Sequence, residues 1–425
     1  MRYCTRCLYP ENHPLGIIFD AAGVCSGCRV HEEKDQLDWV ARAARLGALF
    51  DGYRNRSGKN YDCIVPVSGG RDSYFIVDTV KRVYGMNPLL VTYNKHYNTR
   101  VGIRNLGYLR TQFDCDLLTL TVDPATVKKI TRATLRRRAS MYWHCIAGQT
   151  VFPVQVAVRF KVPLIVWGVH QGVDQVGMFS HLDEAEMTRK YRKDHDLMGL
   201  EAEDLVGEFD NIKERDVTQY LYPHDKDIEA VGVRGVYLSN YLRWDSKAQH
   251  EEMIRRFGYE AAPQSRTFDT YNDVDCWHYS DLHDDLKFQK LGYGKATDHA
   301  CREIRLKRLS REAAIALVTR YQSHQPESRD QFLRWIGMNP AGLQFYVDLH
   351  RDQRIWAKNL DGSWTVTDSV TRHTRDAGVE AVRLGAGGDC EFQFTPSREP
   401  DVADDRYVLL GKGHVDDRDR SGPWG

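Results

Sequence analysis

The stretch CIVPVSGGRDSYFIVDTVKRVYG, residues 63–85, decides the fold. Its first five residues are apolar and predict a short buried strand, and the amphipathic run after residue 72 predicts a helix. Two glycines between them, Gly69 and Gly70, let the backbone approach an anion closely, and the free N–H groups of the following helix favour negative charge. Ser68 and Ser73 add hydroxyl donors. The stretch therefore predicts a phosphate-binding loop between a strand and a helix.

Further apolar runs on the carboxyl side continue this pattern. Strands are expected at PLLVTY (88–93), DLLTLTV (116–122) and VPLIVWGV (162–169). Helices are expected from about residue 31 to 50, from about Thr99, from Pro124 at the first helical position, and before residue 162. Apolar strands spaced by amphipathic helices are typical of an α/β fold with a doubly wound parallel sheet. Ligands bind such sheets beyond the carboxyl ends of the strands, where we expect Thr92, Gly168 and His170.

An acidic residue sits inside the glycine-rich loop. Asp72 is oddly placed beside a polyphosphate unless a divalent cation lies between them, so we assign it to Mg²⁺. No lysine follows the glycines, which excludes a Walker A loop.

Four cysteines near the amino terminus form two CxxC pairs. Cys4 and Cys7 are followed, after 17 intervening residues, by Cys25 and Cys28. This spacing is typical of a tetrahedral zinc site. Four protein ligands leave no open position, so we expect the zinc to be structural.

Composition narrows the class of protein. The chain has 425 residues, and its 59 Lys and Arg balance 59 Asp and Glu, so nucleic acid is an unlikely partner. No apolar run reaches the length of a membrane span, and the first residues lack the pattern of a signal peptide. We expect a cytoplasmic protein with no membrane contact, whose ten cysteines are thiols or metal ligands.

Two further segments make a family resemblance specific. SGGRDS resembles the pyrophosphate loop of the PP-loop ATP pyrophosphatase superfamily (adenine nucleotide alpha hydrolase-like). Together with the cysteine pairs, the segment HCIAGQTVFPVQVAVRFKVPLIVWGVHQGVDQVGMFS and the segment DTYNDVDCWHYSDLHDDLKFQKLGYGKATDHACREIRLKRLSREAA, it resembles the N-acetyl sugar amidotransferases of bacterial surface-polysaccharide (LPS and O-antigen) biosynthesis. The resemblance covers roughly residues 1–345. One departure is Val169, where many relatives are expected to carry an acidic residue.

The resemblance implies an activity and a set of ligands. It implies an AMP-forming carbon–nitrogen ligase that converts the acetamido group of a nucleotide-linked or nonulosonic sugar to an acetamidino group, using ATP, Mg²⁺ and ammonia. The expected ATP and pyrophosphate contacts are Ser68, Gly69, Gly70, Arg71, Asp72, Ser73, Thr92, Gly168 and Lys295.

A dense polar segment is expected to form one wall of the active site. It contains His278, His283, Asp284, Lys287, Lys295, Asp298, His299, Arg302 and Arg305. Lys295 follows Gly292-Tyr293-Gly294, and flexible glycines would let it close over departing pyrophosphate. With Asp72 and His170, Lys295 completes the predicted catalytic set.

The ammonia source is expected to be another protein. Cys4 belongs to the metal site, and Cys145 lacks the glycine-flanked elbow of a glutaminase nucleophile. We therefore expect separate subunits similar to the paired glutaminase and cyclase of histidine synthesis.

Domain limits and two alternative functions complete the expectations. The zinc module and a linking helix should occupy residues 1–50, the ATP-binding α/β domain 51–180, a mainly helical substrate region 181–350, and an extension of unassigned role 351–425. A PP-loop tRNA-thiolating enzyme would instead need a basic face and paired catalytic cysteines. A non-catalytic zinc-containing scaffold would leave Asp72 without a purpose.

Overall fold

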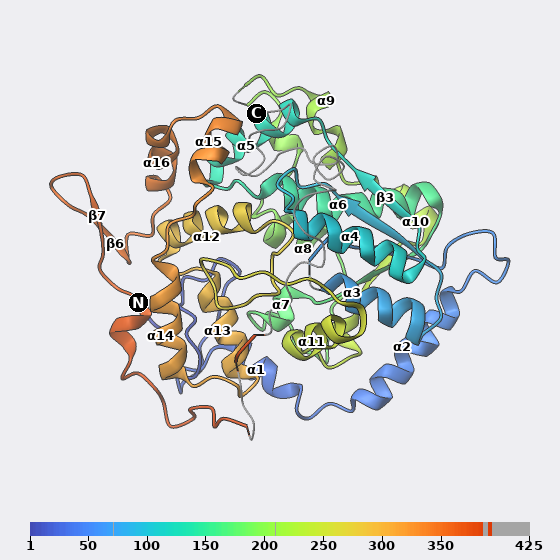
Figure 1. Cartoon of the computed structure of the whole chain (residues 1–425), viewed down its shortest axis with the longest axis horizontal. Helices are drawn as coiled ribbons and strands as arrows, with labels where there is room; N and C mark the ends of the chain where they lie inside the picture. The colour runs from blue at the N-terminus through green and yellow to red at the C-terminus, as the bar shows by residue number, and fades with distance from the viewer. Residues whose placement is uncertain (71, 209, 386–389, 393–425) are drawn as a thin grey trace.

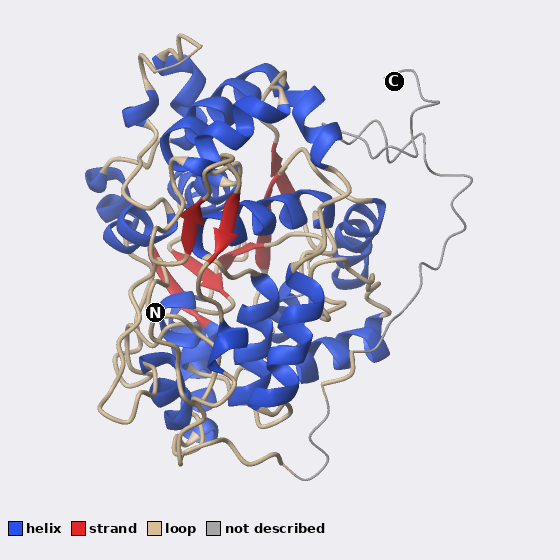
Figure 2. Ribbon diagram, turned by 90° about the vertical axis from the view of Figure 1, so that its left-hand side faces the viewer, coloured by secondary structure: helices blue, strands red, loops and turns tan. Residues whose placement is uncertain are grey.

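A parallel sheet forms the centre of the molecule (Figures 1 and 2). The computed structural model describes residues 1–70, 72–208, 210–385 and 390–392. Five strands lie in the order β3-β2-β1-β4-β5, with all neighbours parallel. They are β1 (Cys63–Pro66), β2 (Pro88–Tyr93), β3 (Leu117–Leu120), β4 (Leu164–Trp167) and β5 (Arg234–Tyr237). The chain turns from one side of β1 to the other between β3 and β4, which creates a switch point beside β1.

Helices cover both faces of this sheet. The α-helices of the first 257 residues are α1 (Ser26–Glu33), α2 (Trp39–Tyr53), α3 (Asp72–Val77), α4 (Arg100–Phe113), α5 (Pro124–Arg138), α6 (Trp143–Phe160), α7 (Gln171–Asp174), α8 (Arg189–Tyr191), α9 (Glu214–Val217), α10 (Asp225–Val231) and α11 (Ser246–Phe257). Short π- and 3₁₀-helices join them: η1 (Asp78–Val83), η2 (Arg192–Asp196), η3 (Glu203–Leu205), η4 (Thr218–Tyr220) and η5 (Leu238–Asn240).

Alternate strand residues point into different cores. Cys63 and Val65 of β1 pack in a core that α2, α3, α4 and α11 cover. Ile64, between them, packs with α6 in a second core. Since successive side chains of a strand point to opposite faces, these cores lie on the two sides of the sheet. The doubly wound α/β arrangement predicted from the sequence is thus present in the structure.

The structure corrects two of the expected elements. One helix over residues 31–50 was wrong, because α1 ends at Glu33 and α2 begins at Trp39. Asp38 caps α2 by accepting hydrogen bonds from the N–H groups of Val40 and Ala41. The sequence also missed β5, whose four residues lie in a region that was expected to be mainly helical. The expected strands 63–67, 88–93, 116–122 and 162–169 are confirmed as β1 to β4.

The carboxyl-terminal third packs against the amino-terminal segment (Figure 1). Its elements are α12 (Trp277–Leu291), α13 (Lys295–Arg305), α14 (Arg311–Gln322), α15 (Arg329–Ile336), α16 (Pro340–Asp348), β6 (Trp356–Lys358), β7 (Trp364–Val366) and η6 (Val370–His373). Residues 386–389 and 393–425 of the expected extension lie outside the described residues. Among the helices that are described, none has both the length and the apolar character needed to cross a bilayer.

Candidate active site

The glycine-rich loop joins β1 to α3 at the switch point of the sheet. Ser73 Oγ accepts a hydrogen bond from the Ser68 N–H at 2.9 Å, and Ser68 Oγ accepts one from the Gly70 N–H at 3.0 Å. These bonds fold the loop over the first turn of α3, which begins at Asp72. Arg71 lies outside the described residues. The loop therefore lies between a strand and a helix, as the sequence predicted, and its binding of an anion stays a prediction.

Close backbone packing explains the glycine at position 69. A Cβ atom there would lie 1.9 Å from the carbonyl oxygen of Gly102 in α4. A Cβ atom on Gly102 would in turn lie 2.3 Å from Cα of Asp275. The loop, the start of α4 and the segment around Asp275 are thus stacked backbone against backbone. Only glycine fits at both contacts.

Asp275 and Lys95 form a buried ion pair beside the loop, and the sequence analysis missed both residues. Lys95 Nζ lies 2.7 Å from Asp275 Oδ2, and Asp275 Oδ1 lies 3.2 Å from the Cβ position of Gly70. Burial opposes the charge of Lys95, but Asp275 outweighs it and raises the pKa of Lys95 well above its ordinary value. Lys95 comes two residues after β2, and this position at the carboxyl edge of the sheet was the signal available in the sequence.

Asp72 faces α11 as well as the loop. Its Oδ1 lies 3.4 Å from Nε2 of His250, and its side chain keeps 26% of its surface exposed. Carboxylate oxygens are ligands that Mg²⁺ prefers. Asp72 begins α3 directly after the loop, and Asp275 contacts Gly70, so these two carboxylates are suitable to hold such an ion near the loop.

A cavity of about 490 Å³ lies beside the segment that packs on the loop, since Asn272 and Asp273 line the cavity and Asp275 contacts Gly70. It is walled by the amino-terminal segment, the chain after β4, the segment 272–273 and helices α12 and α13. Lys295 lines it, as do His283, Asp284, Lys287, Asp298, His299, Arg302 and Arg305. Trp244 lines it too, and this ring lies 3.1 Å from the Cβ position of Gly168. The predicted contacts Ser68, Gly69, Gly70, Asp72, Ser73 and Thr92 do not line it.

Lys295 is the first residue of α13 and is held by several oxygen atoms. Its Nζ lies 2.5 Å from Asp281 Oδ1, and it donates hydrogen bonds to Gln264 Oε1 at 2.9 Å and to Ser280 Oγ at 3.1 Å. Burial opposes the charge, but Asp281 and Asp273 raise the pKa of Lys295. The group is therefore a fixed cation on the cavity wall.

The amino-terminal segment also lines the cavity, which the sequence analysis did not predict. The Tyr9 hydroxyl and the Gln175 side-chain amide each donate a hydrogen bond to Asp298 Oδ1 at 3.1 Å. Lys287 Nζ donates to Asp298 Oδ2 at 2.6 Å. Asp298 thus joins three separate parts of the chain. His13 and Lys34 complete this side of the wall.

Two cavity residues titrate far from their ordinary range. Burial raises the pKa of Asp196 to about 7, although Arg192 opposes the shift. Burial and then Lys290 lower the pKa of His283 to about 3. Near neutral pH, Asp196 therefore exchanges a proton readily, whereas His283 is uncharged. Asp196 was not among the predicted site residues, because burial cannot be read from an isolated Asp in a charged segment.

Two predicted residues, His170 and Thr92, are not among the residues that line the cavity. His170 packs among aromatic rings, with centroids 4.4 Å from Tyr191 and 4.6 Å from Tyr237. Burial lowers the pKa of His170 to about 4, so its ring is neutral near pH 7. Thr92 is buried within β2, opposite Thr119 of β3. Their predicted functional roles stay predictions.

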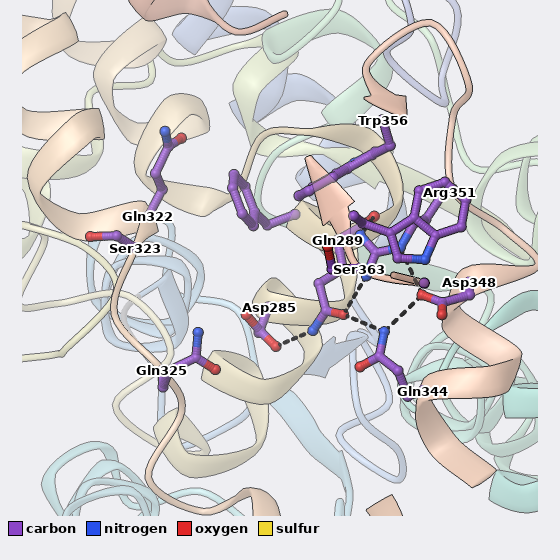
Figure 3. Close-up of a pocket in the computed structure, with 13 residues that line it drawn as sticks. Asp285, Gln289, Gln322, Ser323, Gln325, Gln344, Asp348, Arg351, Trp356 and Ser363 are labelled. Carbon is purple, nitrogen blue, oxygen red and sulfur yellow. Dashed lines mark hydrogen bonds and ion pairs between the residues drawn. The ribbon is translucent and has the colours of Figure 1, made fainter. Parts of the chain in front are cut away.

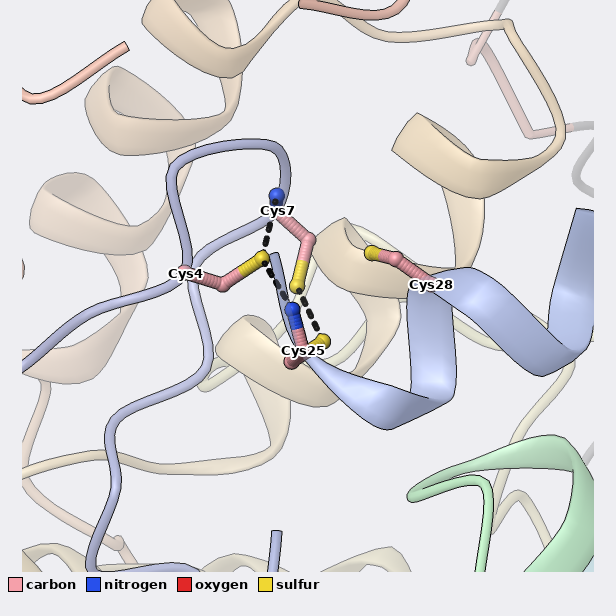
Figure 4. A group of neighbouring side chains, drawn as sticks. All are labelled: Cys4, Cys7, Cys25 and Cys28. Carbon is pink, nitrogen blue, oxygen red and sulfur yellow. Dashed lines mark hydrogen bonds between the residues drawn. The ribbon is translucent and has the colours of Figure 1, made fainter. Parts of the chain in front are cut away.

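The four predicted metal ligands form one buried cluster (Figure 4). The sulfur atoms of Cys4, Cys7, Cys25 and Cys28 all lie within 4.8 Å of one another. Cys4 Sγ accepts hydrogen bonds from the N–H groups of Cys7 and Cys25, each at 3.3 Å. A tetrahedral zinc site with Zn–S bonds of about 2.3 Å places its sulfur atoms about 3.8 Å apart, and Cys7 and Cys25 Sγ lie 3.6 Å apart. The cluster fits a zinc ion, which these four thiolates would hold.

Helix α13 connects this cluster to the cavity. Cys301 Sγ accepts a hydrogen bond from the Leu8 N–H at 3.3 Å. One turn further, Arg305 Nη2 lies 3.6 Å from Cys25 Sγ, and Arg305 Nη1 donates to the Gln175 carbonyl at 2.7 Å. Four thiolates around one Zn²⁺ carry net negative charge, which the buried Arg305 guanidinium would offset. The same helix presents Lys295, Asp298 and Arg302 to the cavity.

Comparisons with known proteins find one family model that matches part of the chain. Residues 253–371 match the family model described as LPS biosynthesis protein WbpG-like, C-terminal domain. This segment includes Asp275 and Lys295. No curated protein matches the chain. The structure of NMN synthetase from Francisella tularensis is similar over 52% of this chain and 93% of that chain, with 11% identity and a TM-score of 0.24.

Proposed function

We propose that this chain is an ATP-dependent, AMP-forming amidotransferase that converts the acetamido group of an N-acetylated sugar to an acetamidino group in surface-glycan biosynthesis. One observation carries the proposal. Asp275, from the segment that matches the LPS biosynthesis model, packs directly over Gly70 of the glycine-rich loop, and the same segment supplies Lys295 to the adjoining cavity. The glycine-rich loop and the segment that matches the LPS biosynthesis model thus pack against each other, which supports the proposal.

The chemistry requires the acetamido group to be activated first. An amide carbon is a poor electrophile, so direct attack by ammonia is slow. In the proposed reaction the acetamido oxygen attacks the α-phosphorus of ATP, the bond to pyrophosphate breaks, and the amide nitrogen loses its proton. Ammonia then adds to the carbon of this O-adenylated imidate, and AMP leaves with the former acetamido oxygen. The products are the amidine, AMP and pyrophosphate.

Residues of the loop and the cavity have separate tasks in this reaction. The N–H groups and hydroxyls of the loop would stabilise the charge that develops on pyrophosphate. Lys95 and Lys295, which are paired with Asp275 and Asp281, would add positive charge. Asp196 is the candidate acceptor for the amide proton, since it lines the cavity and titrates near neutral pH. Mg²⁺, when bound by Asp72 and Asp275, would neutralise phosphate charge.

Ammonia is proposed to come from separate glutaminase and cyclase-like subunits. Cys145 is fully buried, and burial raises the pKa of its thiol well above the ordinary value. A neutral, buried thiol is a poor nucleophile. Cys145 therefore does not supply the nucleophile that a built-in glutaminase needs.

The thiolation alternative is less well supported by the site. It needs reactive cysteines near the nucleotide, and Cys276 is the neighbour of Asp275. Burial and then Asp275 raise the pKa of Cys276 to about 12. A thiol in this state carries almost no thiolate near pH 7. The sugar amidotransferase is accordingly the function we propose.

Product analysis tests the proposal. The full chain is incubated with ATP, Mg²⁺, ammonium and a panel of nucleotide-linked and nonulosonic acetamido sugars, and the sugars are examined by mass spectrometry. We expect one class of sugar to exchange its acetamido oxygen for an NH group while AMP accumulates in equal amount. Glutamine should not replace ammonium unless a glutaminase is added. Turnover that yields ADP, or sugars that all return unchanged, would count against it.

A further inference from the structure

A second cavity, of about 400 Å³, lies on the other side of α12 (Figure 3). Ser280, His283 and Lys287 of this helix line the first cavity, whereas Phe288 and Gln289 line the second. The remaining walls are the end of α14, helix α16 and the β6-β7 hairpin. Asp285 of α12 also lines this cavity. The residues of the remaining walls are Gln322, Ser323, Gln325, Gln344, Asp348, Arg351, Trp356, Gly362, Ser363 and Trp364. No step of the proposed reaction uses these residues.

A hydrogen-bonded network fixes the polar side of this cavity (Figure 3). The Gln289 side chain donates to Asp285 Oδ2 at 2.7 Å and accepts from Gln344 and Arg351, each at 3.1 Å. Gln344 and Arg351 also donate to Asp348 Oδ1, at 2.8 and 2.7 Å. The carboxamide groups are therefore held in one orientation before any ligand arrives.

Aromatic rings form the apolar side. The Arg351 guanidinium lies 4.5 Å from the ring centroid of Trp356 and 5.1 Å from that of Trp364. Phe288 packs edge-on against Trp356 at 5.8 Å. Trp356 is 7% exposed, and within the described part of the chain its buried indole N–H has no hydrogen-bond partner. A buried donor without a partner is costly, so it points to an acceptor that the protein does not supply.

The charges and donors select the class of ligand. The charge of Arg351 is balanced by its ion pair with Asp348. The pKa of Asp285 is raised, chiefly by burial and further by the neighbouring Asp284. The cavity therefore has no excess cation for a phosphate or a carboxylate. Its glutamine side chains offer both donors and acceptors, which suit hydroxyl groups that also do both. The ring of Trp364, which is half-buried, offers a flat apolar surface of the kind against which the C–H face of a pyranose packs.

We propose that this second cavity is a carbohydrate-binding site for uncharged pyranosides, separate from the site of the amidotransferase reaction. Hydroxyl groups would bond to Gln289, Gln344 and the indole N–H of Trp356, and a ring face would lie against Trp364. A volume of about 400 Å³ is within the range typical of small-molecule sites. The proposal stands on this cavity alone and does not depend on the proposed function.

Binding of two neutral trisaccharides to the full chain tests this inference. The probes are N-acetylglucosamine trisaccharide and maltotriose, followed by saturation-transfer NMR and by titration. We expect at least one of them to bind, and Gln344→Ala and Trp364→Ala each to weaken its binding about tenfold or more. Phe345→Ala is the matched control. Phe345 follows Gln344 on α16, is 60% exposed and does not line the cavity, so this variant should bind the trisaccharide within about twofold of the wild-type affinity.

Two further measurements make the test decisive. In the unmodified chain the bound trisaccharide should reduce acrylamide quenching of tryptophan fluorescence. This measurement uses the wild-type chain alone, so it does not depend on whether a variant folds. Lys295→Ala, in the first cavity, should leave trisaccharide binding unchanged, so failure of the amidotransferase proposal does not affect the result. The inference is overturned if neither trisaccharide binds, if Gln344→Ala and Trp364→Ala bind as well as wild type, or if Lys295→Ala abolishes binding.

Discussion

Arg305 lies against Cys25, with its Nη2 atom 3.6 Å from the cysteine Sγ. A Cβ atom on Gly27 would lie 2.3 Å from this guanidinium, so α1 and α13 are closely packed at this point. Arg305 is on the same helix as Lys295, which lines the first cavity. The cysteine cluster therefore braces the helix that forms the cavity wall, in addition to folding its own short segment.

This contact predicts that loss of the metal loosens α13, the helix that forms part of the wall of the first cavity. Cys25→Ser should remove zinc and lower the melting temperature, because it removes one of the four thiolates through which the ion would join the two cysteine pairs. Hydrogen exchange in α13 should rise at the same time. Metal analysis, calorimetry and exchange mass spectrometry measure the three effects. Cys390→Ser, outside the cluster, is the control and should retain the metal. A folded, metal-free Cys25→Ser chain with unchanged exchange in α13 would refute this coupling.

A second prediction concerns the backbone contact at the loop. Gly69→Ala places a Cβ atom 1.9 Å from the Gly102 carbonyl oxygen, so we expect it to destabilise the fold by about 1–3 kcal/mol. It should also weaken ATP binding. Gly107 lies on the exposed side of α4, the helix that contains Gly102, and a Cβ atom there would meet no other atom within 4 Å. Gly107→Ala should therefore stabilise the fold by about 0.5–1 kcal/mol. Urea denaturation distinguishes the two variants. Equal effects would mean that the loop does not pack as described.

A third prediction separates the pyrophosphate step from folding. Asp72→Asn keeps the shape of the side chain but removes the charge that would hold Mg²⁺. Lys295→Ala removes a cation from the cavity. Each should lower exchange of labelled pyrophosphate into ATP, measured with sugar present, by about a hundredfold or more. Their melting curves should still show a cooperative transition. Exchange at the wild-type rate in either variant would remove that residue from the step.

Asp196 supplies a prediction on pH. Its pKa is raised by burial to about 7 in the folded chain, so the folded state binds this proton more tightly than the unfolded state does. The protonated Asp196 side chain therefore stabilises the folded state. This contribution is fully present below about pH 4, near the pKa of an aspartate in the unfolded chain, and is lost as the pH rises through about 7. Asp196→Asn should therefore flatten the decrease in melting temperature between these values. Asp194→Asn, an exposed neighbour whose pKa is lowered by Lys190, should keep that decrease. An unchanged profile in Asp196→Asn would contradict the assigned shift.

The sequence was most informative where local pattern determines structure. The apolar run at Cys63, the glycines after it and the proline at position 124 predicted a strand, a loop and a helix start that the structure contains. The cysteine spacing predicted a cluster that the structure brings together. In each case neighbours in the chain supply the decisive contacts.

The remaining features depend on contacts between distant residues. The residues of the hydrogen bond from Lys95 to Asp275 are 180 positions apart in the sequence, and those of the hydrogen bond from Tyr9 to Asp298 are 289 positions apart. The pKa of Asp196 depends on burial by parts of the chain that no local pattern identifies. The short strand β5 lies in a charged region and is recognisable mainly by its pairing with β4. Such features require the folded arrangement.

The fate of the acetamido oxygen tests the central claim most directly. A sugar with heavy oxygen in its acetyl carbonyl is incubated with the chain, ATP, Mg²⁺ and ammonium, and the products are analysed by mass spectrometry. The proposed adenylation predicts that the label appears in AMP, with none in pyrophosphate and none left in the amidine. Label retained in the sugar product, or release of ADP and phosphate in place of AMP and pyrophosphate, would contradict it.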